Sequence, residues 1–428
     1  MNLIEARSYL RHIKRDFFLT NSFFFLLNTL AVTGLGFLFW WASARFYSSS
    51  VLGEFVVTIT TAQLITTMAN FGLSYSIIRY LPVCYEEKKI EIINTTITIV
   101  ILFSTILSIL VLILAQFFPS SFSSHSINGR QFFLFLVFVV SLGVYQLLSP
   151  ILAVSRSGMI LLCTSVATGI SRIVLLVSLS LKFDNSQMLM VAYALPTCLA
   201  CIFLLSGAIP RLIGGFSLSP GLNIGVLRSI RKYSLLSYGS NVLHDLPYQL
   251  FPQYISNQIG LASAAYFYVS WNFFNLITTL ANSFSLSMFV EGSYRINKIS
   301  ELKRKNIISV ILLTGTIAAS IYILAHPLLQ LFGDDYAQNG VPLLRIITIT
   351  SVPAVLVYSL VAFLRIKMSL FPVLTAFGII AVLSISFSEF HFYQDLAEAG
   401  IAWGISQFAA LTFLLVYFNW RNFSDRRP

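Results

Sequence analysis

The sequence predicts an all-α integral membrane protein with about twelve transmembrane helices in two six-helix bundles. Of its 428 residues, 57% are hydrophobic and only 10% are charged, with a mean hydropathy of +0.82. Soluble domains carry about 25% charged residues. Apolar runs of about 20 residues, long enough to cross a bilayer as a helix, recur along the chain. A polar motif in the first half also returns in the second half.

The repeated motif is LITTMAN at 64–70, which returns as LITTLAN at 276–282, 212 residues later. Polar side chains recur at the same offset with helical spacing, so each set follows one helix face. They are Thr60, Gln63, Thr67 and Asn70 in the first stripe and Asn272, Asn275, Thr279 and Asn282 in the second. We interpret the pair as ligand-binding stripes of a duplicated protein. The alternative is that both are seams where membrane helices pack through polar side chains.

The first half, residues 1–210, contains six predicted spans. Their approximate bounds are 17–44, 53–82, 92–117, 131–154, 157–181 and 188–210. The basic N-terminus predicts a short interfacial helix before the first span. Arg172 lies inside the fifth span, where a buried cation is costly and is expected to face protein, water or an anionic ligand.

A polar connector at 211–233 separates this bundle from the second one at 234–428. The second bundle has predicted spans at 234–257, 263–291, 306–331, 342–364, 369–389 and 400–420. Because each half has an even number of spans, both halves cross the membrane in the same direction. Span 234–257 is the most polar and contains Asn241, His244 and Asp245. His244 and Asp245 are adjacent, so their side chains are expected to point in different directions rather than to form a pair.

The net charge of +11 is distributed unevenly across the predicted spans. Of the 27 basic residues, 22 fall in one set of alternating loops or span ends. Three, Arg45, Arg130 and Lys182, fall on the other side, and Arg172 and Arg345 fall within spans. Cytoplasmic loops carry such an excess, so both termini are predicted to be cytoplasmic. The charge orients the protein and meets anionic membrane lipids, and we expect no nucleic-acid partner.

Three ionisable residues inside the spans are candidates for ion coupling, because a charge at membrane depth is a functional hypothesis by default. These are Asp245, His244 and Glu54. The alternative for Asp245 is a structural role, as acceptor of hydrogen bonds from Ser or Tyr. Arg79 and Glu291 occupy equivalent positions under the 212-residue offset. Their opposite charges predict a cytoplasmic gate.

Two groups of local motifs resemble those of a transporter family. VLGEF at 51–55, NFGLS at 70–74 and IIRY at 77–80 resemble the second-span signature of the O-antigen and polysaccharide flippases. These belong to the multidrug/oligosaccharidyl-lipid/polysaccharide exporter superfamily. LFGDDY at 331–336 and VPLLR at 341–345 resemble the stretch between the ninth and tenth spans of such proteins.

The resemblance implies a V-shaped, MATE-like transporter with a central cavity lined largely by spans 1, 2, 7 and 8. It implies that the substrate is an undecaprenyl-pyrophosphate-linked O-antigen or polysaccharide unit. This unit would move from the cytoplasmic to the periplasmic leaflet of the bacterial inner membrane. It further implies a proton or sodium gradient as the driving force and the polysaccharide polymerase machinery as a partner.

That substrate assigns roles to the polar residues. Amide and hydroxyl side chains both donate to and accept from sugar hydroxyls, which suits Asn241 and the two stripes. The arginine fork suits pyrophosphate, because it makes bidentate charge-assisted bonds with phosphate oxygens. The candidates are Arg45, Arg79, Arg172 and Arg345. For each, a role in topology or salt bridging is the alternative.

Three other classes compete with the flippase. A drug or metabolite cation antiporter of the same superfamily would share the fold, but it should carry acidic residues in its spans. A polymerase or ligase of the O-antigen type would need a large external loop with catalytic residues, and the predicted external loops are short. A channel is disfavoured by the duplicated halves. We therefore expect no enzymatic activity and no cofactor.

Overall fold

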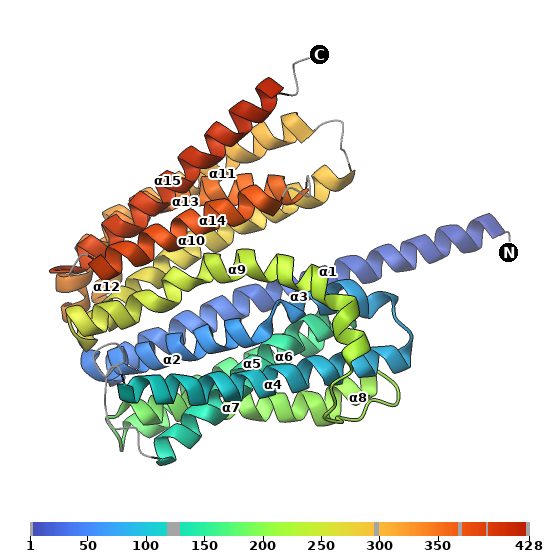
Figure 1. The fold of residues 1–428 in the computed structure, drawn as a ribbon, viewed down its shortest axis with the longest axis horizontal. Helices are drawn as coiled ribbons and strands as arrows, with labels where there is room; N and C mark the ends of the chain where they lie inside the picture. The colour runs from blue at the N-terminus through green and yellow to red at the C-terminus, as the bar shows by residue number, and fades with distance from the viewer. Residues whose placement is uncertain (1–2, 118–128, 295–298, 367–369, 391–392, 425–428) are drawn as a thin grey trace. The chain divides into compact units, whose positions relative to one another are not determined.

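Figure 1 shows the computed structural model, whose backbone is described for residues 3–117, 129–294, 299–366, 370–390 and 393–424. Side chains in these ranges are described except at 3–22, 26, 83, 115–117, 227–237, 280–294, 299–307, 309–310, 365–366, 370, 390 and 420–424. Every regular element within the described backbone is helical. The chain divides into two compact units, and the boundary between them passes through α1 and α2.

The first unit comprises Met1–Ser43, Ile65–Ile113 and Ile127–Leu235. Its helices are α1 (Leu3–Phe46), the end of α2 (Ser49–Asn70), α3 (Leu73–Tyr80), η1 (Leu81–Val83), α4 (Glu86–Phe117), α5 (Gly129–Val154), α6 (Gly158–Ser180), α7 (Ser186–Phe203), η2 (Leu204–Ala208) and α8 (Ile209–Leu212). Helix α5 contacts α3, α6 and α7, and α6 also contacts α7. Aliphatic side chains, among them Ile77, Ile93 and Leu147, form the core of this unit.

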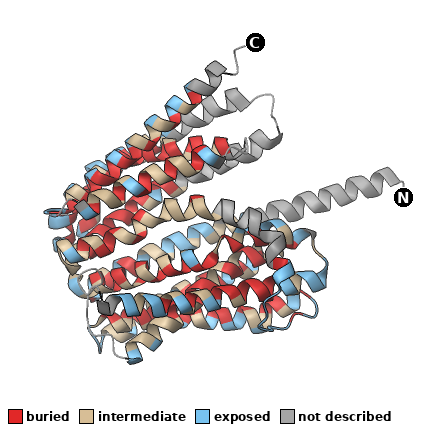
Figure 2. Cartoon of the chain, viewed as in Figure 1, coloured by how far each residue is buried: buried red, intermediate tan, exposed pale blue. Residues whose placement is uncertain are grey.

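The second unit comprises Ala44–Leu64, Leu114–Ser126 and Leu236–Pro428. Its helices are α9 (Ile224–Gln258), α10 (Leu261–Tyr294), α11 (Ile299–Ile323), α12 (Ala325–Gln330), α13 (Asp334–Ile366), α14 (Leu370–Phe390) and α15 (Leu396–Ser424). Helix α13 is central, because it contacts α10, α11, α12, α14 and α15. Buried residues concentrate on its faces and on those of α10 (Figure 2). Trp271 and Trp403 lie at the middle of an aromatic core, with ring centroids 4.8 Å apart.

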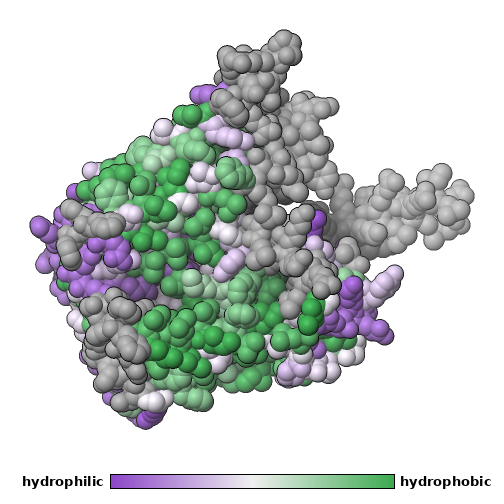
Figure 3. Space-filling model, viewed as in Figure 1, coloured by the Kyte–Doolittle hydropathy of each residue, from purple (hydrophilic) through white to green (hydrophobic). Residues whose placement is uncertain are grey.

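Nine helices in the described part of the chain are long and apolar enough to cross a membrane. They lie at 23–46, 49–70, 86–114, 129–154, 158–180, 186–212, 334–364, 371–389 and 396–419. Helices α9, α10 and α11 occupy the predicted spans at 234–257, 263–291 and 306–331. Hydrophobic side chains cover much of the outward helix surface in Figure 3. The predicted all-α, multi-pass fold is confirmed.

Two predicted spans are interrupted. The span at 53–82 breaks after Asn70, where Phe71 (φ 45°) and Gly72 (φ 70°) both adopt left-handed backbone conformations that a continuing helix excludes. The span at 306–331 breaks at Leu324. Pro327 has no N–H to donate to the carbonyl of Ile323 four residues earlier, so the helix ends there and restarts as α12.

Two other elements are longer than the sequence predicts. Helix α1 is continuous from Leu3 to Phe46, so the separate interfacial helix predicted before the first span is wrong. Helix α9 begins at Ile224, inside the predicted connector. The rest of the connector packs on α4, where the Asn94 amide donates to the carbonyl of Ser217 (3.0 Å) and the Thr98 hydroxyl accepts from the N–H of Gly221 (3.2 Å). Residues up to 235 thus group with the first unit, and the division at 211–233 stays a prediction.

Candidate functional site

The beginning of the first polar stripe lies in the second unit, where α2 meets α9. The Gln253 amide of α9 donates to the hydroxyls of Thr60 (3.3 Å) and Thr61 (3.0 Å). Thr60 is fully buried, and its own hydroxyl donates to the carbonyl of Val56 (2.8 Å). Gln63 lies one turn further along α2 and is half-buried. Thr60 is therefore engaged in helix packing, which is the alternative that the sequence left open for the stripe.

The end of that stripe lies in the first unit. Asn70 is buried, accepts a bond from the backbone N–H of Ser74 (3.2 Å) and donates to the Ser74 hydroxyl (3.0 Å). Its amide thus bridges the break between α2 and α3. Thr67 is half-buried on the same helix. Next to it, the Thr66 hydroxyl accepts from the Gln146 amide of α5 (3.2 Å).

The second stripe runs along α10 in the second unit. Asn272, Asn275 and Thr279 are half-buried, and the side chain of Asn282 lies outside the described residues. The Asn272 amide nitrogen is buried with no hydrogen-bond partner among the described atoms. Since a buried unpaired amide costs about 1–3 kcal/mol, this nitrogen marks a position where a ligand or water is favoured. Asn241 lies on α9 of the same unit and is half-buried.

Arg172 lies on the buried face of α6 in the first unit. Its guanidinium carbon is 3.6 Å from the centroid of the Tyr193 ring, and it donates to the Thr197 hydroxyl (2.8 Å), both on α7. Within the described residues, no carboxylate lies within the 4.0 Å ion-pair distance of Arg172, and its Nε has no hydrogen-bond partner. Arg172 is therefore a partly buried cation with a spare N–H donor and without a counter-ion among the described side chains.

The other three candidate arginines are exposed. Arg45 ends α1 and donates to the carbonyls of Leu331 (2.7 Å) and Gln330 (3.0 Å), where it satisfies the last carbonyls of α12. Arg345 on α13 lies 5.3 Å from the centroid of the Tyr322 ring of α11. Arg79 ends α3 with its guanidinium 5.8 Å from the Tyr80 ring. Its predicted gate partner, Glu291, lies outside the residues whose side chains are described.

His244 and Asp245 form a pair, and the prediction that they point apart is wrong. The Nδ1 of His244 lies 2.6 Å from an Asp245 carboxylate oxygen. Neighbouring helix positions differ by about 100°, but Nδ1 is the ring nitrogen nearest the backbone and is within reach of a short carboxylate. The imidazole packs edge-on against Tyr358 of α13 (5.2 Å) and Phe377 of α14 (4.9 Å). An imidazole–carboxylate pair is suited to exchanging a proton.

Glu54, the third coupling candidate, is half-buried on α2. It follows Gly53, where an added Cβ would overlap the Leu261 carbonyl at the start of α10. Glycine is thus required for the close approach of these two helices. Sequence reasoning missed Gln253 and Gln146, which join helices through the first stripe. Gln146 is an amide inside an apolar span, and that is the signal that would have found it. Gln253 lies in the polar helix α9, where one more amide is not distinctive.

No family model matches the chain, and no curated protein matches it in sequence. Its fold does match solved structures. A structure of the lipid II flippase MurJ in an inward closed conformation aligns with a TM-score of 0.75 and 15% identity, over 92% of this chain and 87% of that one. An inward-facing multidrug resistance MATE transporter of the MOP superfamily aligns at 0.66 and 15% identity, over 93% and 94% of the two chains.

A third match is a MOP superfamily transporter from Pyrococcus furiosus, with a TM-score of 0.58 and 13% identity over 95% of this chain and 96% of that one. That structure is described as having a binding pocket of reverse polarity that suggests a different function. These alignments span nearly the whole chain. The predicted fold class, that of the MATE-like transporters, is therefore confirmed, and the similar structures are transporters and flippases.

Proposed function

We propose that this protein is a flippase for lipid-linked oligosaccharides whose headgroup is joined to a polyprenyl tail by pyrophosphate. It would move the unit from the cytoplasmic to the periplasmic leaflet of a bacterial inner membrane, with both termini cytoplasmic. The observation that carries the proposal is Arg172, a cation held inside the first unit with no counter-ion among the side chains that the structure describes. The fold shared with a lipid II flippase supports it.

The position of Arg172 supports an anionic substrate group. At 1.5 Å per residue, Arg172 is about 12 Å from the Ser180 end of α6 and about 21 Å from the Gly158 end. A charge that far inside a hydrocarbon layer costs several kcal/mol unless it is compensated. Tyr193 and Thr197 hold the guanidinium through its face and one N–H. The remaining donors suit phosphate oxygens.

The amide-rich faces of α2 and α10 suit the sugar part of this substrate. Asn272 has a buried N–H that finds no partner in the described part of the chain, and Asn275 lies one turn further along the same helix. Sugar hydroxyls accept from such groups and donate to their oxygens. We assign Gln63, Thr67, Asn275 and Thr279 to the same role. Thr60 and Asn70 support these faces through packing.

We assign ion coupling to His244 and Asp245, because an imidazole and a carboxylate lie in contact at 2.6 Å inside the second unit. Sodium is the alternative coupling ion. The polysaccharide polymerase machinery would receive the product.

The test is transport by the purified protein in liposomes. A fluorescent pyrophosphate-linked oligosaccharide on a short polyprenyl tail is supplied in one leaflet, and its appearance in the other is measured with an impermeant quencher. We expect flipping by the wild type and its loss in Arg172→Ala. Arg130→Gln, which changes an exposed arginine at the start of α5, is the matched control and should flip normally. Equal flipping by Arg172→Ala and wild type would contradict the proposal.

A cation antiporter is the second candidate, favoured by the half-exposed carboxylate of Asp245. The same liposomes separate the two functions. An antiporter would accumulate a fluorescent organic cation under an imposed ion gradient and would ignore the lipid-linked sugar. A flippase gives the opposite result. Arg172 argues against the antiporter, because a partly buried cation inside the first unit favours an anionic over a cationic substrate.

A further inference from the structure

Gln407 on α15 has a buried amide that the protein leaves unpaired. Its side chain is 0% exposed, and neither its oxygen nor its nitrogen has a hydrogen-bond partner among the described atoms. Trp403 lies one turn earlier on the same helix face, is 2% exposed and has an indole N–H that is also unpaired there. Three polar atoms, two donors and one acceptor, therefore lie together inside the second unit.

Hydroxyl groups lie next to this pair, between α14 and α15. The Ser384 hydroxyl donates to that of Ser406 (3.0 Å), which in turn donates to the carbonyl of Trp403 (2.7 Å). Closer to the start of α15, the hydroxyls of Ser388 and Tyr393 are bonded at 2.8 Å. All three serines are fully buried. Buried polar side chains thus extend from Tyr393 to Gln407.

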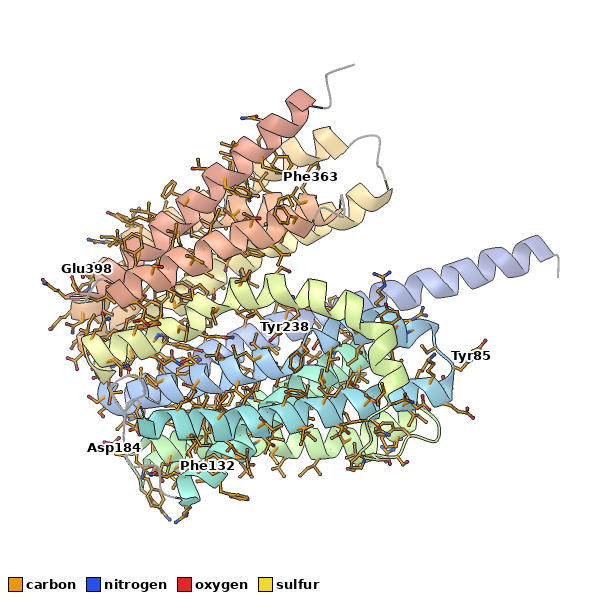
Figure 4. The ribbon with its side chains drawn as sticks, in the orientation of Figure 1. Tyr85, Phe132, Asp184, Tyr238, Phe363 and Glu398 are labelled. Atoms are coloured by element: carbon orange, nitrogen blue, oxygen red, sulfur yellow. The ribbon has the colours of Figure 1, made fainter. Side chains whose placement is uncertain are left out.

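The His244–Asp245 pair lies further along the same interior. Figure 4 places Glu398 and Phe363 toward opposite ends of the second unit, and the buried polar side chains begin at Tyr393, near Glu398 in the sequence. Phe377, which contacts His244, precedes Ser384 by two turns of α14, about 10 Å. Ser384 bonds to Ser406, so these two residues lie at the same height along the bundle, and Gln407 follows Ser406. Measured along the bundle axis, Gln407 is therefore about 9 Å from the height of Phe377 and its contact His244. Along the bundle axis, a separation of that size equals the length of two or three hydrogen-bonded water molecules.

The chemistry of the three unpaired atoms identifies their ligand. Buried waters make about three hydrogen bonds to polar groups that the protein leaves unsatisfied, and they both donate and accept. The Gln407 oxygen accepts, while its nitrogen and the Trp403 indole donate. A monovalent cation needs several oxygen ligands, and two of these three groups carry hydrogens that would face it. A sugar is excluded because Gln407 has no exposed surface.

We propose that Gln407 and Trp403 form a binding site for ordered water inside the second unit, which hydrates the interior between the Glu398 end of α15 and the His244–Asp245 pair. The titratable group that faces His244 from α13 is Tyr358, and from α14 the contact is the apolar Phe377. Where the proposed function holds, this water gives a proton access to the coupling pair. The water site itself does not depend on that function.

The experiment is X-ray hydroxyl-radical footprinting of the purified wild type and of Gln407→Leu, read by mass spectrometry. Radicals formed from bound water oxidise the side chains beside it, so a buried residue is labelled only where water is present. We expect labelling of Trp403 well above that of Phe138, a 0% exposed aromatic residue of the first unit. In Gln407→Leu we expect the label at Trp403 to fall at least fivefold. The label at Phe138 should not change.

A wild-type Trp403 labelled no more than Phe138 would overturn the proposal, as would label that persists unchanged in Gln407→Leu. Gln407→Met serves as a second variant of similar volume if the leucine variant is not recovered. The thermal midpoint gives an independent result. A dry, unpaired amide predicts a marked rise in midpoint for Gln407→Leu, whereas a hydrated amide predicts little change. Labelling is measured without substrate, so loss of flipping alone leaves this result unaffected.

Discussion

Replacement of Arg172 with glutamine removes the charge that the proposed flippase uses, while it keeps a polar side chain at the α6–α7 contact. The glutamine amide retains a donor for the Thr197 hydroxyl and can lie on the Tyr193 ring. The change therefore separates the charge from the packing. Arg172→Lys is the companion variant, because it keeps the charge and loses the planar fork.

The stability of the glutamine variant should differ little from that of the wild type. The variant loses a desolvated cation–π contact of about 2 kcal/mol and weakens one charge-assisted hydrogen bond of about 1.5–3 kcal/mol. It also relieves about 2.5–3.5 kcal/mol for a charge inside the membrane. The opposing contributions are of similar size. We expect the protein to insert and to unfold near the wild-type temperature.

Binding of the substrate should change much more. One charge-assisted bond to a phosphate oxygen contributes about 1.5–3 kcal/mol, which corresponds to about a 10- to 150-fold change in affinity. In the liposome assay at subsaturating substrate, Arg172→Gln should slow flipping by that factor, and Arg172→Lys should retain a larger fraction. Flipping by a well-folded Arg172→Gln at the wild-type rate would refute the assignment of Arg172 to the substrate.

Three further predictions concern packing and coupling. Gly53→Ala should lower the thermal midpoint, because the added Cβ overpacks the start of α10 at a cost of about 1–3 kcal/mol. The control is Gly34→Ala, where nothing lies within 4 Å of the added Cβ, and it should be neutral or slightly stabilising. Equal midpoints for the two variants would contradict the close approach of α2 and α10. Asn70→Ala should cost about 0.5–2 kcal/mol, measured by thermal unfolding, because the bonds to Ser74 across the helix break are lost. Asp245→Asn should insert normally and lose the response of flipping to an imposed pH or sodium gradient; a response that persists would remove Asp245 from coupling.

The fold was predictable because the membrane imposes it. Hydropathy located the nine strongly apolar helices of the described residues, since each backbone polar group in lipid must be bonded within its own helix. The two breaks were harder to find. Pro327 interrupts one span, and the left-handed conformations of Phe71 and Gly72 interrupt the other. These are backbone effects of one or two residues, and the hydropathy around them resembles that of a continuous span. Helix α9 extends into the connector because no proline or glycine pair interrupts 224–233.

Individual site residues were less predictable. Helical periodicity predicts which helix face a side chain lies on, but it does not predict which residue that side chain contacts. The offset of 212 residues predicts two polar stripes, whose residues lie on α2 and α10. It did not distinguish Thr60, whose hydroxyl accepts from Gln253, from Asn272, whose amide nitrogen has no partner among the described atoms. The contact between His244 and Asp245 depends on rotamers, which sequence spacing does not determine.

The two stripes also indicate how such a protein divides its polar residues between helix packing and ligand binding. An amide with a protein partner contributes about 0.5–1.5 kcal/mol to folding, and one without a partner costs about 1–3 kcal/mol. Partnered amides such as those of Gln253 and Gln146 therefore hold helices together. Groups without a partner among the described residues, such as Arg172 Nε and Asn272 Nδ2, weaken the free protein, and a ligand that satisfies them recovers that cost. It follows that substitution of the first class should reduce stability, whereas substitution of the second should reduce transport with little effect on stability.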